Sequence, residues 1–254
     1  MRHGAAFFTR RVLKTGLLLL MLSSWSAQTS ADTSEWGQSV PGVLRRFVPK
    51  GREIALTFDA CGGPKGSAVD RELLDLLRRE KIPATLFISG RWLEKNEGTA
   101  RELAADPLFL VANHGLNHRP LSVSGRSAYR IQGTRSPDEV RREIGENAAL
   151  LAGLTGTTTT LFRSGTNHYD EAAVRLAEAM GHKVVGYTLN GDGGATSPRK
   201  RIVDGLLALT GGEIVLFHMN RPEGATFEGL RDALPELKRR GFRFILLSDR
   251  PLRP

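Results

Sequence analysis

The stretch 54–63, with the sequence IALTFDACGG, places a short apolar run directly before an acidic residue and a glycine-rich turn. A run of this length that ends at a turn signal is typical of a buried strand. Six further runs of the same kind follow along the chain, at residues 84–89, 108–112, 158–162, 183–189, 214–218 and 242–247. The sequence therefore predicts seven short buried strands.

Helical patterns lie between most of these strands. In residues 70–81, four leucines gather on one face and charged residues occupy the other. Further helices are expected from about residue 136, over 170–180 and over 228–240, the last two followed by a glycine that can end a helix. Strands that alternate with helices predict parallel pairing through right-handed crossovers. We therefore expect a single-domain α/β fold with a sheet or barrel at its centre.

Several polar side chains follow the predicted strands directly. In parallel α/β folds, functional side chains collect at the carboxyl ends of the strands. The chain has six candidates in such positions, namely Asp59, His114, His118, Arg163, Asp192 and His218. We expect them to meet at one end of the sheet.

The chemistry of these residue types indicates a hydrolytic metal site. Two histidines four residues apart, His114 and His118, can bind one metal ion if their segment forms a helical turn. Histidines at this spacing also occur on ordinary surfaces, so the pair alone does not decide. Asp59 is a candidate general base and His218 a candidate general acid. The alternatives are an aspartate that caps the turn and a histidine that belongs to the core.

Arg163 and Asp192 are candidates for supporting roles. An arginine can orient a carboxylate base, and an aspartate can bind a histidine ring nitrogen and fix its tautomer. Either residue could instead belong to an ordinary ion pair.

Taken together, these motifs resemble those of the polysaccharide deacetylase family, also called NodB-like or carbohydrate esterase family 4, from about residue 54 to residue 247. The matching stretches are Thr57-Phe58-Asp59, His114 to His118, Phe162-Arg163, Asp192 and Leu216-Phe217-His218. The resemblance implies a distorted (β/α) barrel and a hydrolase that removes N- or O-acetyl groups from a sugar polymer, with zinc or a similar divalent ion. It also implies that Asp59 is the base, that His218 is the acid and that Leu216 lines the pocket for the acetate methyl group.

The chain departs from the family pattern at the metal motif. The family typically has a second aspartate straight after the base as the third metal ligand, and this chain has Ala60 there. Three substitutes are open, namely Asp59 itself, Cys61 as a thiolate and His168. The missing acid leaves a second interpretation, in which the same fold is a catalytically weakened glycan-binding module.

The third motif also departs from the family pattern. It lacks the prolines that usually follow the arginine at position 163. By resemblance, Tyr169 at the end of this motif is still expected to contribute to substrate contacts.

The N-terminal residues have the composition of an export signal. Residues 1–31 combine a basic start, an apolar run and small residues at the end. We predict a signal peptide at 1–31, a polar lead-in at 32–52 and the deacetylase-like domain at 53–250. The apolar run is shorter than a typical transmembrane span, which makes an uncleaved anchor the less favoured alternative. We therefore expect an exported protein, periplasmic or secreted, with no stable span after cleavage.

The charge and cysteine content narrow the possible partners. The 36 Lys and Arg residues and 27 Asp and Glu residues give a net charge of +9, of which four positive charges lie in residues 1–31. The remaining +5 suits anionic envelope polymers or a plain solvated surface. No basic stripe interleaved with aromatic residues indicates nucleic-acid binding. Cys61 is the only cysteine, which excludes an internal disulfide.

Overall fold

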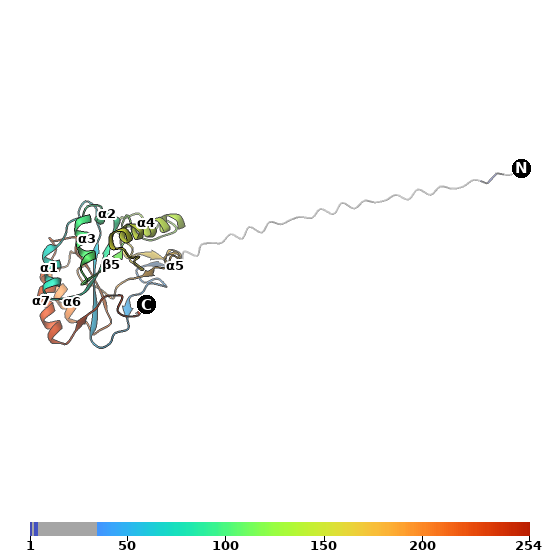
Figure 1. Ribbon diagram of the computed structural model, residues 1–254. Helices are drawn as coiled ribbons and strands as arrows, with labels where there is room; N and C mark the ends of the chain where they lie inside the picture. Colours follow the sequence, from blue (N-terminus) through green and yellow to red (C-terminus); the bar gives the residue numbers. More distant parts are fainter. Residues whose placement is uncertain (2, 5–34) are drawn as a thin grey trace. The chain divides into compact units, whose positions relative to one another are not determined.

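The computed structural model describes residues 35–254 together with residues 1, 3 and 4 (Figure 1). In residues 35–254, eight strands form one parallel sheet in the order β8-β6-β5-β4-β3-β10-β9, with β11 also paired to β3. These strands are β3 (Glu53–Ala60), β4 (Ala84–Ile88), β5 (Phe109–Asn113), β6 (Leu161–Phe162), β8 (Lys183–Val184), β9 (Leu189–Asn190), β10 (Ile214–His218) and β11 (Arg243–Phe244). Every strand predicted from the sequence is present, although 158–162, 183–189 and 242–247 supply only two-residue pieces.

The sheet curls into an incomplete barrel. Strands β8 and β9 lie at opposite edges of the strand order, yet only residues 185–188 separate them in the chain. Five peptide steps span at most about 18 Å, so the two edges must come near each other. The predicted distorted (β/α) barrel is thus confirmed, in the form of a curled sheet with an opening between β8 and β9.

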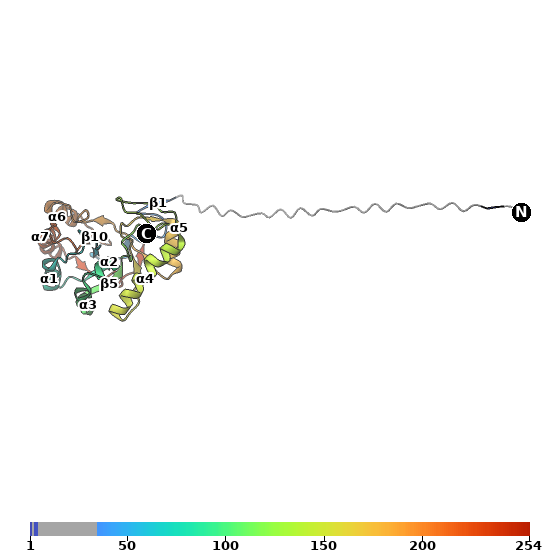
Figure 2. The ribbon, with the colours of Figure 1, turned by 90° about the horizontal axis from the view of Figure 1, so that it is seen from above.

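Seven helices of residues 35–254 surround this sheet (Figure 2). They are α1 (Arg71–Arg79), α2 (Gly90–Leu93), α3 (Glu97–Ala105), α4 (Pro137–Thr155), α5 (Glu171–Ala179), α6 (Arg199–Leu207) and α7 (Thr226–Arg239). The four predicted helices are confirmed within one or two residues at each end that was predicted. Three were not predicted, because α2 is a single turn and because interior glycines weaken the helical pattern of α3 and α6.

Side-chain alternation along β3 and β10 sorts core residues from site residues. On β3, the side chains of Ile54, Leu56 and Phe58 pack with the helices in the largest hydrophobic cluster. The alternate positions Thr57 and Asp59 therefore point to the opposite face, into the barrel. On β10, His218 occupies the matching inward position beside Asp59. This period of two brings polar groups from adjacent strands together at the carboxyl end of the sheet.

The predicted lead-in is integrated into the barrel. Strand β1 (Trp36–Gly37) pairs with β7 (Tyr169–Asp170), and β2 (Arg46–Phe47) pairs with β12 (Leu252–Arg253). Between β1 and β2, Leu44 bonds with the backbone at Val184 and Gly186, so the lead-in runs along the opening between β8 and β9.

The predicted signal peptide, 1–31, lies outside the described residues apart from positions 1, 3 and 4. Among the helices that the structure describes, none has the length and apolar character needed to cross a membrane.

Candidate active site

Asp59, the last residue but one of β3, has one carboxylate oxygen bound by an arginine and the other facing the pocket. Its Oδ1 accepts a hydrogen bond of 2.8 Å from Arg163 Nη1, whereas its Oδ2 lies 3.5 Å from His114 Nε2. Burial disfavours the charged form, but the positive charges of His114 and Arg163 outweigh this effect and lower the pKa of Asp59. The group is therefore an ionised carboxylate with one oxygen free for chemistry.

Arg163 follows β6 and is completely buried. Its guanidinium also donates to the hydroxyl of Thr57 at 3.0 Å and to the carbonyl oxygen of Val185 at 3.2 Å, and it lies 4.1 Å from the centre of the Phe87 ring. These contacts fix the arginine beneath Asp59. Arg163 is therefore a positioning residue for the carboxylate and does not itself reach the pocket.

His218 lies beside Asp59 on the neighbouring strand and is held by Asp192. Its Nδ1 is 2.9 Å from Oδ1 of Asp192, whose other oxygen accepts from the backbone N–H of His218 and from the Thr226 hydroxyl. Burial disfavours the imidazolium, but Asp192 raises the pKa of His218 well above its usual value. Because Nδ1 is engaged, Nε2 is the nitrogen left to exchange a proton in the pocket. Asp192 is completely buried and acts through His218.

Three potential metal ligands converge beside this pair. His114 follows β5, and its Nδ1 lies 3.0 Å from the carbonyl oxygen of Arg163. A carbonyl only accepts, so Nδ1 carries the proton of the neutral ring and Nε2 then has a free electron pair. One donor atom from each of Cys61, His114 and His118 lies within 4.8 Å of the other two. Of the three substitutes open for the missing aspartate, this arrangement favours Cys61.

The three donors fit a divalent metal ion. The Nε2 atom of His118 is buried and has no hydrogen-bond partner in residues 35–254. Burial disfavours a thiolate, yet His118, His114 and His218 lower the pKa of Cys61 well below its usual value. Burial also disfavours a protonated His114, yet Asp59 and Cys61 raise its pKa. A buried position that stabilises positive charge and leaves a nitrogen unpaired has the character of a cation site.

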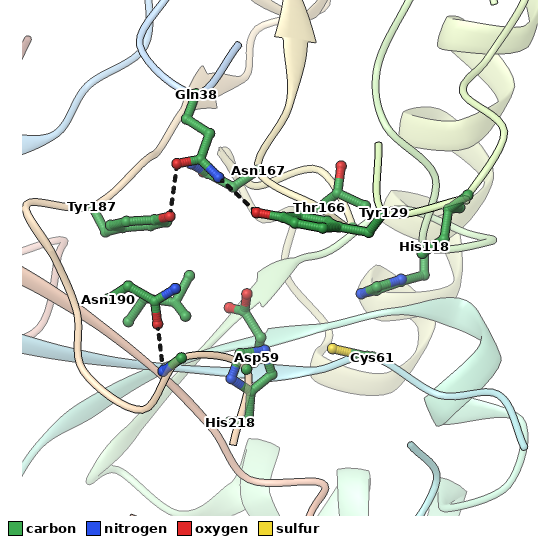
Figure 3. A pocket seen from close by; sticks show the side chains of 15 residues that line it. Gln38, Asp59, Cys61, His118, Tyr129, Thr166, Asn167, Tyr187, Asn190 and His218 are labelled. Carbon is green, nitrogen blue, oxygen red and sulfur yellow. Dashed lines mark hydrogen bonds between the residues drawn. The ribbon is translucent and has the colours of Figure 1, made fainter. Parts of the chain in front are cut away.

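A pocket of about 290 Å³ opens over these groups (Figure 3). Asp59, Cys61, His118 and His218 all line it. Leu216 lines it as well, two residues before His218 on the same face of β10. The pocket thus combines charged groups with an apolar surface at the position where the sequence predicted one.

Two predicted site residues lie elsewhere. Tyr169 is completely buried, accepts a hydrogen bond from the Ser164 N–H and donates one to Asn167 Oδ1, both at 3.1 Å. It braces the loop after β6 and is not among the residues that line the pocket, so it does not occupy the expected substrate-contact position. His168 places its Nδ1 2.8 Å from the Thr166 carbonyl oxygen and does not join the three-donor group.

Glu143, which was not predicted from the sequence, supports the loop that carries His118. This side chain of α4 is buried, and its Oε1 accepts the N–H groups of Asn117 at 3.0 Å and Arg119 at 3.1 Å, on either side of His118. His118 itself has a left-handed backbone, with φ of 57°, which a non-glycine residue adopts only when its surroundings enforce it. An acid next to Ile144 on the apolar face of the helix was the available signal.

The chain is similar to known carbohydrate deacetylases. A family model described as polysaccharide deacetylase matches residues 48–185. The peptidoglycan-N-acetylglucosamine deacetylase of Bacillus cereus is 27% identical over 218 residues, which cover 82% of this chain and 92% of the relative.

Solved structures share the fold. A carbohydrate esterase family 4 pseudoenzyme from Bacillus anthracis aligns with a TM-score of 0.66 at 21% identity, over 81% of this chain and 67% of that one. A family 4 acetyl xylan esterase from Clostridium thermocellum in complex with a cobalt ion aligns with a TM-score of 0.63 at 24% identity, over 78% and 89% of the two chains. At these identities the structural matches establish the fold alone. Because the family model matches more than half of the 254 residues, the chain belongs to the polysaccharide deacetylase family of carbohydrate-deacetylating hydrolases.

Proposed function

We propose that this chain is a metal-dependent hydrolase that removes acetyl groups from a carbohydrate polymer. The observation that carries the proposal is the pair Asp59 and His218. Their pKa values move apart, lowered for the carboxylate and raised for the imidazole, so that a base and an acid face one pocket at the same pH. Titratable groups separated in this way are typical of acid–base catalysis.

The residues divide the reaction between them. Asp59 Oδ2 takes a proton from water as the water oxygen attacks the acetyl carbon, and Arg163 keeps the carboxylate aimed at that proton. When the bond between the acetyl carbon and the sugar nitrogen breaks, His218 Nε2 gives its proton to the nitrogen. Acetate and a free amine leave. Asp192 holds the imidazole in the orientation that this transfer needs.

Cys61, His114 and His118 would hold the metal ion. One sulfur and two nitrogen donors form a set that zinc prefers, and zinc is the ion we propose. Such an ion acts as a Lewis acid, which lowers the pKa of water and polarises a carbonyl. Cys61 would serve as the third ligand in place of the family's second aspartate, which is Ala60 in this chain. Asp59 is then free to serve as the base.

For the substrate, we propose an N-acetylated glycan of the cell envelope. The B. cereus relative is named for N-acetylglucosamine in peptidoglycan. Leu216 supplies apolar surface for the acetyl methyl group. Export directed by residues 1–31, which form the proposed signal peptide, would bring the protein to that polymer in the periplasm or outside the cell.

Acetate release from a panel of acetylated glycans tests the proposal. The protein lacking residues 1–31 is assayed as purified, after chelation and after zinc is restored. Release that chelation removes, that zinc restores and that Asp59→Asn abolishes supports the proposal. Release that survives both chelation and Asp59→Asn overturns it.

A glycan-binding module is the second candidate. Ala60 favours it, because the usual third metal ligand is absent. In this case the protein binds one glycan of the panel tightly, measured by calorimetry, and releases no acetate at any zinc concentration.

A further inference from the structure

Three buried side-chain oxygens near the amino ends of α1 and α7 have no hydrogen-bond partner in residues 35–254. They are Oδ2 of Asp70, Oδ1 of Asn220 and Oε2 of Glu228. Asp70 and Asn220 are only 3% and 2% exposed, so solvent does not satisfy them. Buried polar atoms in folded proteins nearly always have a partner. Three unpaired acceptors in one region therefore call for a ligand.

Two of these oxygens come from adjoining loops. Asp70 ends the loop after β3, residues 61–70, and Asn220 belongs to the loop after β10, residues 219–225. The Asp70 N–H donates to the Met219 carbonyl oxygen at 2.9 Å, and Asn220 Nδ2 donates to the Gly66 carbonyl oxygen at 2.7 Å. These bonds join the two loops. Because the amide nitrogen of Asn220 is engaged, its oxygen is the atom left without a partner.

Glu228 lies at the same level on the neighbouring helix. Helices α1 and α7 lie side by side (Figures 1 and 2), and Lys238 Nζ is 2.8 Å from Glu80 Oε2 near their carboxyl ends. Glu228 precedes Lys238 by ten residues and Asp70 precedes Glu80 by ten, which is about 15 Å back along each helix. Burial raises the pKa of Asp70, and nearby carboxylates, Glu228 among them, raise it further. Both carboxylates therefore lie at the same end of the helix pair.

The chemistry of the three atoms indicates a cation. Asp70 Oδ1 already accepts the Leu73 N–H at 3.0 Å and caps α1, so Oδ2 is the oxygen that is free. Carboxylate and amide oxygens only accept hydrogen bonds. A water molecule has two hydrogen atoms to donate and leaves the negative charges in place, whereas one cation binds all three oxygens and offsets the charge. An oxygen-only set suits a hard divalent ion and not the zinc that sulfur and nitrogen donors favour.

We propose that Asp70, Asn220 and Glu228 bind a calcium ion, which ties the loop after β3 to the loop after β10. Calcium accepts oxygen ligands in a flexible geometry and takes water for the rest of its shell, whereas magnesium demands a near-ideal octahedron that irregular loops rarely supply. The two loops begin directly after the strands that carry Asp59 and His218, so the ion holds the chain behind both residues. The proposal does not depend on the proposed function, because calcium binding is measured without turnover.

Urea unfolding of the full chain, loaded with zinc and free of calcium, tests the proposal. Sites of this kind in exported proteins bind calcium with a Kd of about 10⁻⁴ M or weaker. With that Kd, about 10 mM calcium shifts the unfolding equilibrium about 100-fold toward the folded protein. Magnesium at the same concentration gives a smaller shift. No shift with calcium, or a larger one with magnesium, overturns the proposal.

Two variants locate the calcium response. Asp70→Asn removes the charge and keeps an oxygen for the Leu73 N–H, and Glu228→Gln makes the same change on α7. We expect each to lower calcium affinity at least about tenfold and, without calcium, to be at least as stable as the wild type, because repulsion between unpaired oxygens is relieved. Asp75→Asn, exposed on α1, is the matched control and responds as the wild type does. Variants that are destabilised equally with and without calcium have lost only a structural contact, which overturns the proposal.

Cys61→Ala separates this site from the candidate zinc site. A calcium response in Cys61→Ala equal to that of the wild type supports a second, independent site. A response that disappears with Cys61 means that calcium acts in the pocket, and the proposal fails. If no glycan yields acetate, the proposed function fails alone, since none of these measurements uses turnover.

Discussion

Strand β3 carries a buried carboxylate at each end, and the two are bound in opposite ways. At the amino end, each carboxylate oxygen of Glu53 accepts two hydrogen bonds. Arg250 donates to both oxygens at 2.6 and 2.8 Å, Arg243 donates to Oε1, and the Lys50 N–H donates to Oε2. At the carboxyl end, Asp59 has one oxygen bound by an arginine and the other facing the pocket.

The difference separates a carboxylate that only holds structure from one that could also take part in the proposed reaction. A carboxylate with every acceptor site occupied cannot take up another partner without losing one. A carboxylate with one fixed oxygen keeps its orientation and can still accept a proton at the other. The two ends of the strand therefore differ in how many hydrogen-bond acceptor positions of the carboxylate are occupied. They do not differ in burial or in pairing with arginine.

The largest expected effect comes from removing the negative charge of Asp59. Asp59→Asn keeps the shape but cannot take a proton, so we expect kcat/KM for acetate release to fall by about 10²–10⁴-fold. Glu53→Gln makes the same chemical change at the other end of β3 and is the matched control. Its activity per folded molecule should equal that of the wild type. Equal losses in the two variants would contradict the comparison.

The next effect concerns the metal ligands. Cys61→Ala removes the sulfur donor, and we expect zinc affinity, measured by competition with a chromophoric chelator, to fall by at least about 100-fold. With cobalt as a probe, the wild type should show a sulfur-to-metal charge-transfer band that Cys61→Ala lacks.

Ala60→Asp tests the assignment of Cys61 as a ligand by restoring the aspartate that the family has at this position. If Cys61 already completes the site, restoring the aspartate changes zinc affinity little in the wild type and recovers affinity in the Cys61→Ala background. A large gain in the wild-type background would show that Cys61 is not a ligand.

Glu53→Gln should lower the free energy of unfolding by about 2 kcal/mol near neutral pH, because it breaks a buried, charge-assisted network. Hydrogen bonds from Arg250 lower the pKa of Glu53 from 4.5 to about 2. This stabilisation is complete above pH 4.5 and is lost as the pH falls toward 2. The difference between wild type and variant, measured by urea unfolding, should therefore shrink below pH 4.5. A difference that grows in acid would contradict the assignment.

Much of the fold and the place where the candidate site residues meet could be predicted from the sequence. Apolar runs fixed the strands, and the rule that parallel strands present chemistry at their carboxyl ends identified Asp59, His114 and His218. These residues sit at the end of regular elements, so their position in the chain determines their position in space.

Residues outside that rule could not be predicted. The contact between Gln38 and Tyr187 spans 149 residues and depends on how the lead-in crosses the barrel opening. The motif position of Tyr169 indicated substrate contact, but its hydroxyl braces the loop from within. Sequence patterns do not specify which way a loop side chain turns.

Glu143 extends the comparison to a third buried carboxylate. It lies on α4, where a charged residue suggests a solvent-facing position, yet it is buried against the loop that carries His118. Burial raises the pKa of Glu143, and the hydrogen bonds from the backbone N–H groups of Arg119 and Asn117 offset only part of this effect. Like Glu53, Glu143 stabilises the local structure through its hydrogen bonds. Like Asp59, it lies next to the candidate site, because those bonds hold the loop that carries His118.

Glu143 gives the smallest of the expected effects. Glu143→Ala leaves the N–H groups of Asn117 and Arg119 without their acceptor, so the strained backbone at His118 is free to relax. We expect zinc affinity to fall about tenfold, as for other groups that orient a metal ligand. Glu143→Gln keeps an acceptor oxygen and should stay near the wild type, and Glu146→Ala, one turn along on the exposed face, is the control. If Glu143→Gln were as damaging as Glu143→Ala, the charge and not the loop geometry would be what α4 supplies to the site.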